Sequence, residues 1–207
     1  MIKKCFFLTI FLLFASTLFA YEKGGVFFCL KGGIGASFPV SYNNYKKTPG
    51  RMPEIALVWN TGVSLEYSFK DNIIFNAELL YEYQPLFYKD RRANITYIYD
   101  FSYITIPAGI RFIFAERFLV GAGLHYSFKI NSAHSAKSRN VKISLEPLPN
   151  EQNDIGIFVD IGLNFKLSET NNLSAYFRVK HGFIDVIKDT KIIANAATIN
   201  AAYNFMF

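Results

Sequence analysis

The segment Ala197–Phe207, ATINAAYNFMF, carries an apolar or aromatic residue at every odd position. Polar Thr198, Asn200 and Asn204 lie between them. A period of two predicts a β-strand with one apolar face and one polar face. An apolar strand that ends on a charged carboxylate suits a barrel whose rim lies at a membrane interface, because that charge must stay in water. We therefore expect this strand to belong to a membrane barrel.

Seven other segments show the same alternation. They span about residues 26–37, 56–69, 73–84, 101–114, 118–129, 155–167 and 173–183. Between residues 155 and 167 every odd position is apolar, while Asp160, Asn164 and Lys166 occupy even positions. Apolar residues that are spread evenly at alternate positions suit a barrel whose outside is apolar. The sequence therefore predicts an all-β fold, an eight-stranded antiparallel up-and-down transmembrane β-barrel.

The predicted connections alternate between short and long. The short ones cover residues 70–72, 115–117 and 168–172, and the long ones cover residues 39–55, 85–100, 130–154 and 184–191. Outer-membrane barrels have short periplasmic turns and longer extracellular loops. A soluble lipocalin-like barrel would also alternate, but its apolar face would point inward. Aromatic residues at the strand ends argue against that alternative, because they suggest interfacial girdles. These residues are Tyr67, Phe69, Tyr81, Tyr83, Phe112 and Phe128.

The first 20 residues have the pattern of a secretory signal peptide. A short basic start at Lys3 and Lys4 precedes a mainly apolar stretch, and small residues precede the expected cleavage after Ala20. Residues 1–20 are therefore predicted to be removed, which leaves residues 21–207 as one barrel domain. The remaining segment would hold a single cysteine, Cys29, so we expect no disulfide within the chain.

Ten charged residues share the strand face that is predicted to point into the lumen. They are Lys31, Glu66, Glu78, Glu82, Arg111, Lys129, Asp160, Lys166, Arg178 and Lys180. The interior of an eight-stranded barrel is filled by side chains, and glycines on the same face make room for these long ones. Four carboxylates can pair with six cations, which predicts a plug of salt bridges. The alternative is a narrow pore that prefers anions, because cations exceed carboxylates along its wall.

Three parts of the chain resemble features of known outer-membrane barrels. Tyr203, Phe205 and Phe207 resemble the C-terminal assembly signal of bacterial outer-membrane β-barrels. The stretch Tyr103–Arg111, YITIPAGIR, and the string Glu78–Tyr81, ELLY, resemble the PorT-like and OmpX-like branch of the small outer-membrane β-barrel domains. The resemblance implies a place in the bacterial outer membrane, insertion by the barrel-assembly machinery and contact with outer-membrane lipid. Thr105 stands where that family often has Glu, and none of these motifs implies an activity.

Catalytic and metal-binding patterns are weak. His125 and Ser127 have the His-x-Ser spacing of the outer-membrane lipid A deacylases, but they are predicted to face the lumen rather than lipid. A lipid-modifying enzyme is therefore only a third alternative. His134 and His181 are isolated, so no metal site or other cofactor is expected.

The predicted long connections carry more basic than acidic residues. A basic rim would attract anionic glycans or lipid headgroups, and no nucleic-acid partner is expected. The sequence therefore predicts a non-enzymatic protein with a structural or surface-interaction role of the adhesion type.

Overall fold

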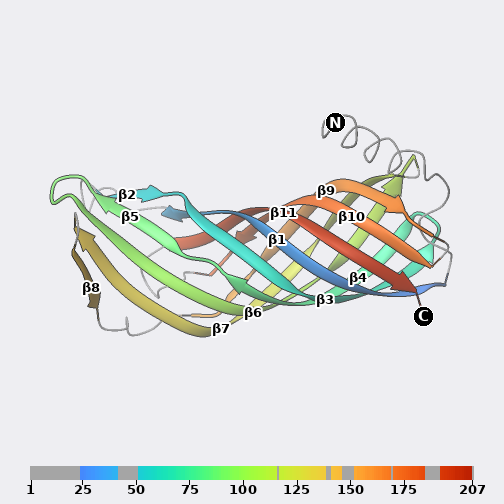
Figure 1. Cartoon of the computed structure of the whole chain (residues 1–207), viewed down its shortest axis with the longest axis horizontal. Coiled ribbons are helices and arrows are strands. Elements are labelled where there is room, and N and C mark those ends of the chain that lie inside the picture. Colours follow the sequence, from blue (N-terminus) through green and yellow to red (C-terminus); the bar gives the residue numbers. More distant parts are fainter. Residues whose placement is uncertain are drawn as a thin grey trace, which may run out of the picture.

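The computed structural model describes residues 24–41, 51–115, 117–138, 141–145, 152–168, 170–184 and 192–206. Within these residues the chain forms eleven β-strands (Figure 1). They are β1 (Val26–Ser41), β2 (Arg51–Glu54), β3 (Ala56–Lys70), β4 (Ile73–Tyr83), β5 (Leu86–Asp90), β6 (Ile95–Phe114), β7 (Phe118–Ser138), β8 (Val141–Leu145), β9 (Asp154–Lys166), β10 (Asn171–Gly182) and β11 (Ile192–Met206). None of the described residues belongs to a helix with the length and apolarity needed to cross a membrane.

Eight of the strands close into a ring. Their order around the ring is β1, β3, β4, β6, β7, β9, β10 and β11, and every neighbouring pair is antiparallel. The first and last strands close it over a long register, from Phe27 opposite Met206 to Ser41 opposite Ile192. Neighbours in the ring are also successive long strands of the chain. The prediction of an eight-stranded antiparallel up-and-down barrel is confirmed.

The alternation of side chains follows the prediction along the barrel strands. In β9, Ile155, Ile157 and Val159 point outward and are 39–43% exposed, whereas Phe158 and Asp160 point inward and are 0–1% exposed. Successive side chains of a strand point to opposite faces, so the apolar set covers the outside of the ring. This is the arrangement that a barrel in lipid requires.

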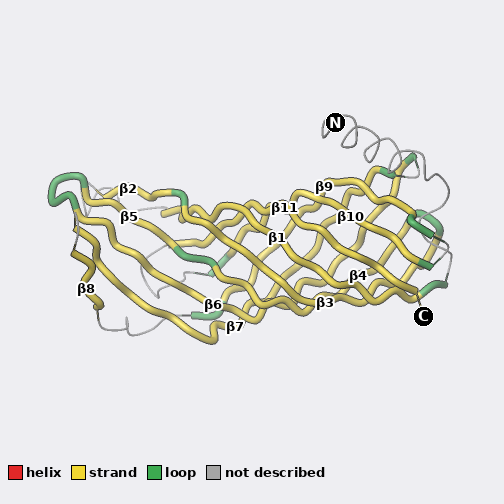
Figure 2. The backbone as a smooth tube through the Cα atoms, in the orientation of Figure 1, coloured by secondary structure: helices red, strands yellow, loops and turns green. Residues whose placement is uncertain are grey.

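Three of the connections that we predicted to be polar loops contain strands instead. β5 pairs with the end of β6 that runs beyond the ring, β8 pairs with the corresponding end of β7, and β2 pairs with β5, which gives the order β2-β5-β6-β7-β8. We call β2, β5, β8, residues 95–101 of β6 and residues 131–138 of β7 the projecting sheet. It leaves the ring at the end opposite the short turns, on the left in Figures 1 and 2. The prediction of loops was wrong here because alternating residues continue past the barrel, as in Leu86, Tyr88, Tyr97 and Tyr99.

A β-bulge marks the boundary between the ring and the projecting sheet. Ser102 pairs with Asn131, whereas Tyr103 pairs with Lys129, so Ile130 is an extra residue on β7. A bulge bends its strand and increases the local twist. We infer that this bend lets the two longest strands leave the cylinder and continue as an open sheet.

A buried apolar cluster lies toward each end of the lumen. Phe27, Cys29, Ile74 and Ile113 form one buried cluster near the short turns. Leu86, Phe101, Tyr103 and Ala194 form another near the projecting sheet. The polar interior described below lies between these two clusters.

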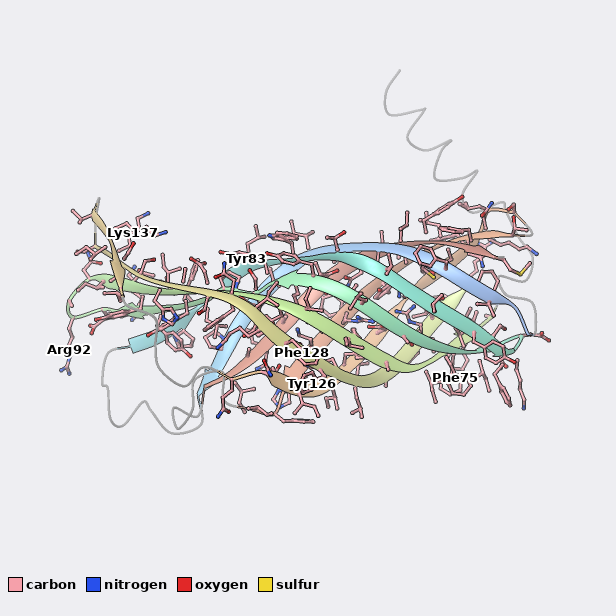
Figure 3. The ribbon with its side chains drawn as sticks, turned by 90° about the horizontal axis from the view of Figure 1, so that it is seen from below. Phe75, Tyr83, Arg92, Tyr126, Phe128 and Lys137 are labelled. Atoms are coloured by element: carbon pink, nitrogen blue, oxygen red, sulfur yellow. The ribbon has the colours of Figure 1, made fainter. Side chains whose placement is uncertain are left out.

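The predicted girdle residues lie on the outer surface in two groups. Tyr67, Phe69 and Phe112 are 40–50% exposed near the short turns. Tyr81, Tyr83 and Phe128 lie toward the other rim, where the ring centroids of Trp59 and Tyr81 are 5.3 Å apart. Figure 3 shows Phe75 toward the short-turn end and Tyr83, Tyr126 and Phe128 nearer the middle of the molecule. The distance between the two groups is spanned by the outward apolar residues of the ring.

Candidate functional site

Six charged side chains from six strands meet in the middle of the lumen. The cations are Lys31 of β1, Arg111 of β6 and Arg178 of β10, and the carboxylates are Glu66 of β3, Glu78 of β4 and Asp160 of β9. No side chain among them is more than 6% exposed. We call these six residues the lumen ion network. Its three cations and three carboxylates make it electrically neutral.

Glu78 lies at the centre of the network. Its carboxylate accepts hydrogen bonds from Lys31 at 2.9 Å, from Arg111 at 3.0 Å and from Arg178 at 2.8 and 2.9 Å. The side-chain amide of Asn76 donates a further bond at 2.9 Å. Charge-assisted bonds of this kind are stronger than neutral ones. Glu78 therefore links all three cations of the network.

Asp160 and Glu66 complete the pairing on either side. Asp160 accepts from Nε of Arg178 at 2.7 Å and from Nη2 of Arg111 at 3.0 Å. Glu66 accepts from Nζ of Lys31 at 3.3 Å and from Nη1 of Arg111. Both arginines thus bridge two strands that are distant in the sequence, and the network ties opposite walls of the barrel together.

Inward aromatic rings enclose the two guanidinium groups. The guanidinium carbon of Arg178 lies 4.2 Å from the centroid of the Phe158 ring, and that of Arg111 lies 4.7 Å from the Tyr176 ring. Contacts of this kind gain energy from the ring quadrupole, most of all where water is excluded. The sequence analysis did not assign these two rings a role, although their even positions in alternating segments place them inside.

A glycine provides the space for the side chain of Arg111. A Cβ atom at Gly121 would lie 2.7 Å from Cγ of Arg111, so a larger residue there would displace the arginine. Gly121 therefore acts as predicted, as space for a long charged neighbour.

A second, smaller cluster lies between the network and the projecting sheet. Nζ of Lys180 donates to both oxygens of Glu82, at 2.6 and 2.7 Å. The hydroxyl of Thr105 donates to Glu82 at 3.1 Å and lies 3.0 Å from the hydroxyl of Ser127. Thr105 is the residue at which the sequence departs from the resembled family, and here it supplies a hydroxyl donor.

Lys129 and Lys166 are only partly buried, unlike the other eight residues of the predicted lumen set. Both are partly exposed, because they lie where β7 approaches the projecting sheet and where β9 reaches a short turn. The backbone amide of Lys129 donates to Asn153 at 3.0 Å. The other eight predicted residues are buried and comprise four cations and four carboxylates, and Asp154 adds a fifth buried carboxylate that faces the lumen. Among the described residues, the buried lumen therefore has no excess of cations, which was the basis of the anion-preferring pore.

His125 and Ser127 face the lumen, and each is 1% exposed. Nε2 of His125 lies 3.2 Å from Oδ2 of Asp154, a carboxylate that we had placed among the loop residues. Asp154 occupies an even position directly before residue 155, and the parity of that segment would have predicted an inward side chain. The hydroxyl of Ser127 is bonded to Thr105. The pair therefore has a carboxylate neighbour, but it has no contact with the lipid-facing surface.

Three buried polar atoms in this region have no hydrogen-bond partner within the described residues. They are the Tyr103 hydroxyl, Nδ1 of His125 and Oδ1 of Asp154. Buried polar groups are normally satisfied by protein or by ordered water. We therefore expect water to reach the half of the lumen that lies toward the projecting sheet.

The other two histidines occupy separate places. His134 lies in the projecting sheet, with its ring 5.2 Å from that of Tyr99 and 6.0 Å from that of Phe101. Burial lowers the pKa of His134, and repulsion by Lys129 lowers it further. Nδ1 of His181 lies 2.6 Å from the side-chain oxygen of Asn195. Among the described residues, no three His, Cys, Asp or Glu side chains are grouped so that they could hold a metal ion.

The predicted assembly signal is described in part. Tyr203 is 41% exposed on the outside of β11, and the ring of Phe205 lies 5.2 Å from that of Phe28 on β1. These rings lie at the short-turn end of the closing strand pair. Phe207 and the predicted signal peptide at residues 1–20 lie outside the described residues.

Comparisons with known proteins agree with this architecture. A family model described as the outer membrane protein beta-barrel domain matches residues 6–205. No curated protein sequence matches the chain. Among solved structures, the chain is similar to Neisserial surface protein A, with 15% identity, coverage of 87% of this chain and 97% of that chain, and a TM-score of 0.46.

Two further solved structures are similar at the same level. Ail of Yersinia pestis is 11% identical over 89% of this chain and 100% of that chain, with a TM-score of 0.44. OprG of Pseudomonas aeruginosa is 13% identical over 91% of this chain and 99% of that chain, with a TM-score of 0.44. At these identities the likeness concerns the fold alone.

Proposed function

Because the chain belongs to the family of outer membrane protein beta-barrel domains, we propose that it is a non-enzymatic surface-interaction protein of the bacterial outer membrane, of the adhesion type. Its lumen is closed by the ion network, and its projecting sheet carries the interaction. The observation that supports this proposal is the combination of a neutral, buried network with a five-stranded sheet that leaves the barrel. A barrel that is closed inside and extended outside is suited to contact rather than to transport.

The route to the membrane is part of the same proposal. A signal peptide at residues 1–20 directs export and is removed. The barrel-assembly machinery then inserts the chain by way of the aromatic C-terminal strand, and outer-membrane lipid surrounds the finished barrel. The outward aromatic rings of Tyr203 and Phe205 support this expectation.

Planar-bilayer recording tests the closed lumen. The purified wild-type barrel should show no steady conductance, because both guanidinium groups and all three carboxylates of the network are held by several bonds at mid-lumen. Steady channels that prefer anions would overturn the proposal and establish the second candidate, a narrow pore. That candidate is favoured by one observation, the three buried polar atoms that need water on one side of the network.

Mass spectrometry of lipid A tests the proposal that this protein does not modify lipid. Cells that carry wild-type protein and cells that carry Ser127→Ala should give the same lipid A spectrum, because Ser127 is 1% exposed and bonded to Thr105. A lipid species that requires wild-type Ser127 would contradict the proposal and favour a lipid-modifying enzyme.

A further inference from the structure

One row of residues crosses four strands of the projecting sheet. Lys89 of β5 lies opposite Thr96 of β6, Thr96 lies opposite Lys137 of β7, and Lys137 lies opposite Lys142 of β8. Directly opposite residues in antiparallel strands share a face of the sheet. The three lysines and Thr96 therefore form one continuous surface, which we call the lysine row.

The lysine row lies on the outer face of the projecting sheet. Leu86, three residues before Lys89, is buried in the cluster that also contains lumen-facing Tyr103. His134, three residues before Lys137, packs against Phe101 of that same cluster. An odd separation in a strand reverses the direction of the side chain. The lysines thus point away from the barrel interior, and Lys137 and Lys142 are exposed.

The lysines of this row do not stabilise the folded protein through contacts with one another. Like charges directly opposite each other in neighbouring strands are destabilising, and Lys137 and Lys142 are such a pair. Neither forms an ion pair with any residue that the structure describes. Lys89 has only a long contact with Glu54, at 3.9 Å, in which both side chains are about 40% exposed, and such surface pairs contribute little. Among the described residues, the row therefore presents positive charge that is largely unpaired.

The spacing of the row fits an extended polyanion better than a single anion. Neighbouring strands lie about 4.8 Å apart, so the row spans about 14 Å from β5 to β8. Arg91 and Arg92, exposed in the turn between β5 and β6, extend the positive charge beyond the row. Figure 3 shows Arg92 and Lys137 at the same end of the molecule. A ligand that repeats its negative charges along a chain could contact the lysine row and both arginines at once.

The position of the lysine row and the side chains in it indicate which class of polyanion it would bind. Thr96 is six residues from Ser102, which pairs with girdle residue Tyr83, so the row lies about 20 Å along the strand beyond the girdle. That distance separates it from lipid phosphates at the membrane surface. The aromatic side chains on which single-stranded nucleic acids stack are absent from this row, and Tyr97 and Tyr99 point to the opposite face. Lysines around a hydroxyl group suit a sulfated or carboxylated sugar chain.

We propose that the lysine row of the projecting sheet binds a linear sulfated or carboxylated polysaccharide outside the cell. This inference rests on the proposed surface-interaction function and specifies its ligand class. Binding is electrostatic and therefore salt-dependent, and it leaves the barrel and the ion network unchanged.

Binding of the full barrel to heparin, used as the probe, tests the proposal. The protein is placed in nanodiscs of zwitterionic phospholipid, so that no anionic membrane sugar is present. Wild type should bind heparin and should not bind uncharged dextran of similar length. Lys137→Gln with Lys142→Gln should weaken heparin binding about tenfold or more. The slope of log affinity against log salt should also fall by about two, by analogy with counterion release from other polyelectrolytes.

Two control variants make the result interpretable. Lys70→Gln with Lys166→Gln removes the same charge at the short-turn end and should change affinity less than about twofold. Lys137→Arg with Lys142→Arg keeps the charge and should bind as wild type does. Heat-modifiable gel mobility verifies that each variant is folded.

Three outcomes would overturn the proposal. They are no heparin binding by wild type, equal loss in both glutamine variants, and equally tight binding of polyglutamate or single-stranded DNA of matched charge. Loss of heparin binding with adhesion to cells retained would remove this inference alone. Steady conductance in the bilayer would remove the proposed closed lumen, whatever heparin does.

Discussion

Glu78 is the residue on which the largest set of lumen hydrogen bonds converges. It contacts one ammonium group and two guanidinium groups, and its side chain is 0% exposed. Its carboxylate therefore offsets much of the cost of burying three cations. A buried ion pair is weak evidence for net stability, but the loss of one partner is costly because the remaining charge is uncompensated.

Glu78→Ala should lower the free energy of unfolding by about 3–5 kcal/mol, because it leaves the network with one surplus positive charge. Urea unfolding in lipid vesicles, followed by tryptophan fluorescence of Trp59, measures the change. Glu54→Ala serves as the control, because it removes an exposed contact at 3.9 Å that should contribute at most about 1 kcal/mol. Equal unfolding midpoints for the two variants would mean that the network does not hold the barrel walls together.

His134 should make the projecting sheet sensitive to acid. Its pKa is lowered in the folded state by burial and by Lys129, while Asp100 opposes the shift. The unfolded state therefore takes up a proton first as the pH falls below about 6.5. Stability is full above that pH and declines as the pH falls through the lower folded pKa. The protection factors of β7 and β8 amides, which compare observed with intrinsic exchange at each pH, should fall between pH 7 and pH 5, and His134→Gln should remove most of that fall. An unchanged fall in protection in the variant would assign it to another group.

At the scale of elements, the two faces of strand β9 have different surroundings, with lipid expected outside the ring and packed side chains inside it. Its odd positions are exposed on the outside of the ring, and Val159 lies between Ala122 of β7 and Val179 of β10. Strand β8 also exposes a valine, Val141, but it belongs to the projecting sheet. The two valines thus compare the same side chain beside lipid and beside water.

Val159→Arg should cost about 2–4 kcal/mol, because it places a charge near the middle of the lipid-facing belt. Val141→Arg should leave stability within about 0.5 kcal/mol, as surface substitutions usually do. Denaturant titration of both variants in vesicles gives the comparison. Similar costs at the two sites would show that Val159 does not face lipid.

At the scale of the whole molecule, the short turns and the projecting sheet lie at opposite ends of the barrel (Figure 1). Barrels of this kind keep their short turns in the periplasm, so we expect the projecting sheet to lie outside the cell. Cys29 is buried in the lumen and 0% exposed, so it should not react with a bulky thiol reagent. If residues 1–20 are removed as proposed, Cys5 is lost with them, and introduced cysteines can be labelled without a competing reaction of Cys29.

Arg92→Cys should react with a membrane-impermeant maleimide on intact cells. Asp71→Cys, in the turn between β3 and β4, should react only after the outer membrane is permeabilised. Gel mobility or mass spectrometry of the labelled protein reports both results. Labelling of Asp71→Cys on intact cells, with Arg92→Cys protected, would mean that the barrel is inserted in the opposite direction.

The sequence by itself determined the all-β class, the number of barrel strands and the direction of the side chains along those strands. These properties depend on a period of two, which is local and can be read from one segment at a time, as in residues 155–167. The same parity placed Lys31, Glu78, Arg111 and Arg178 in the lumen. It would also have placed Asp154 and Phe158 there.

Only the tertiary structure decided which charges meet and where the strands end. Glu78 and Arg178 are 100 residues apart in the chain, and their contact depends on how the strands are staggered when the ring closes. The same closure puts Lys129 and Lys166 near the ends of the lumen, where the wall no longer encloses them. The projecting sheet likewise depends on pairing between distant segments, since β2, β5 and β8 are too short to be stable strands without the extended ends of β6 and β7.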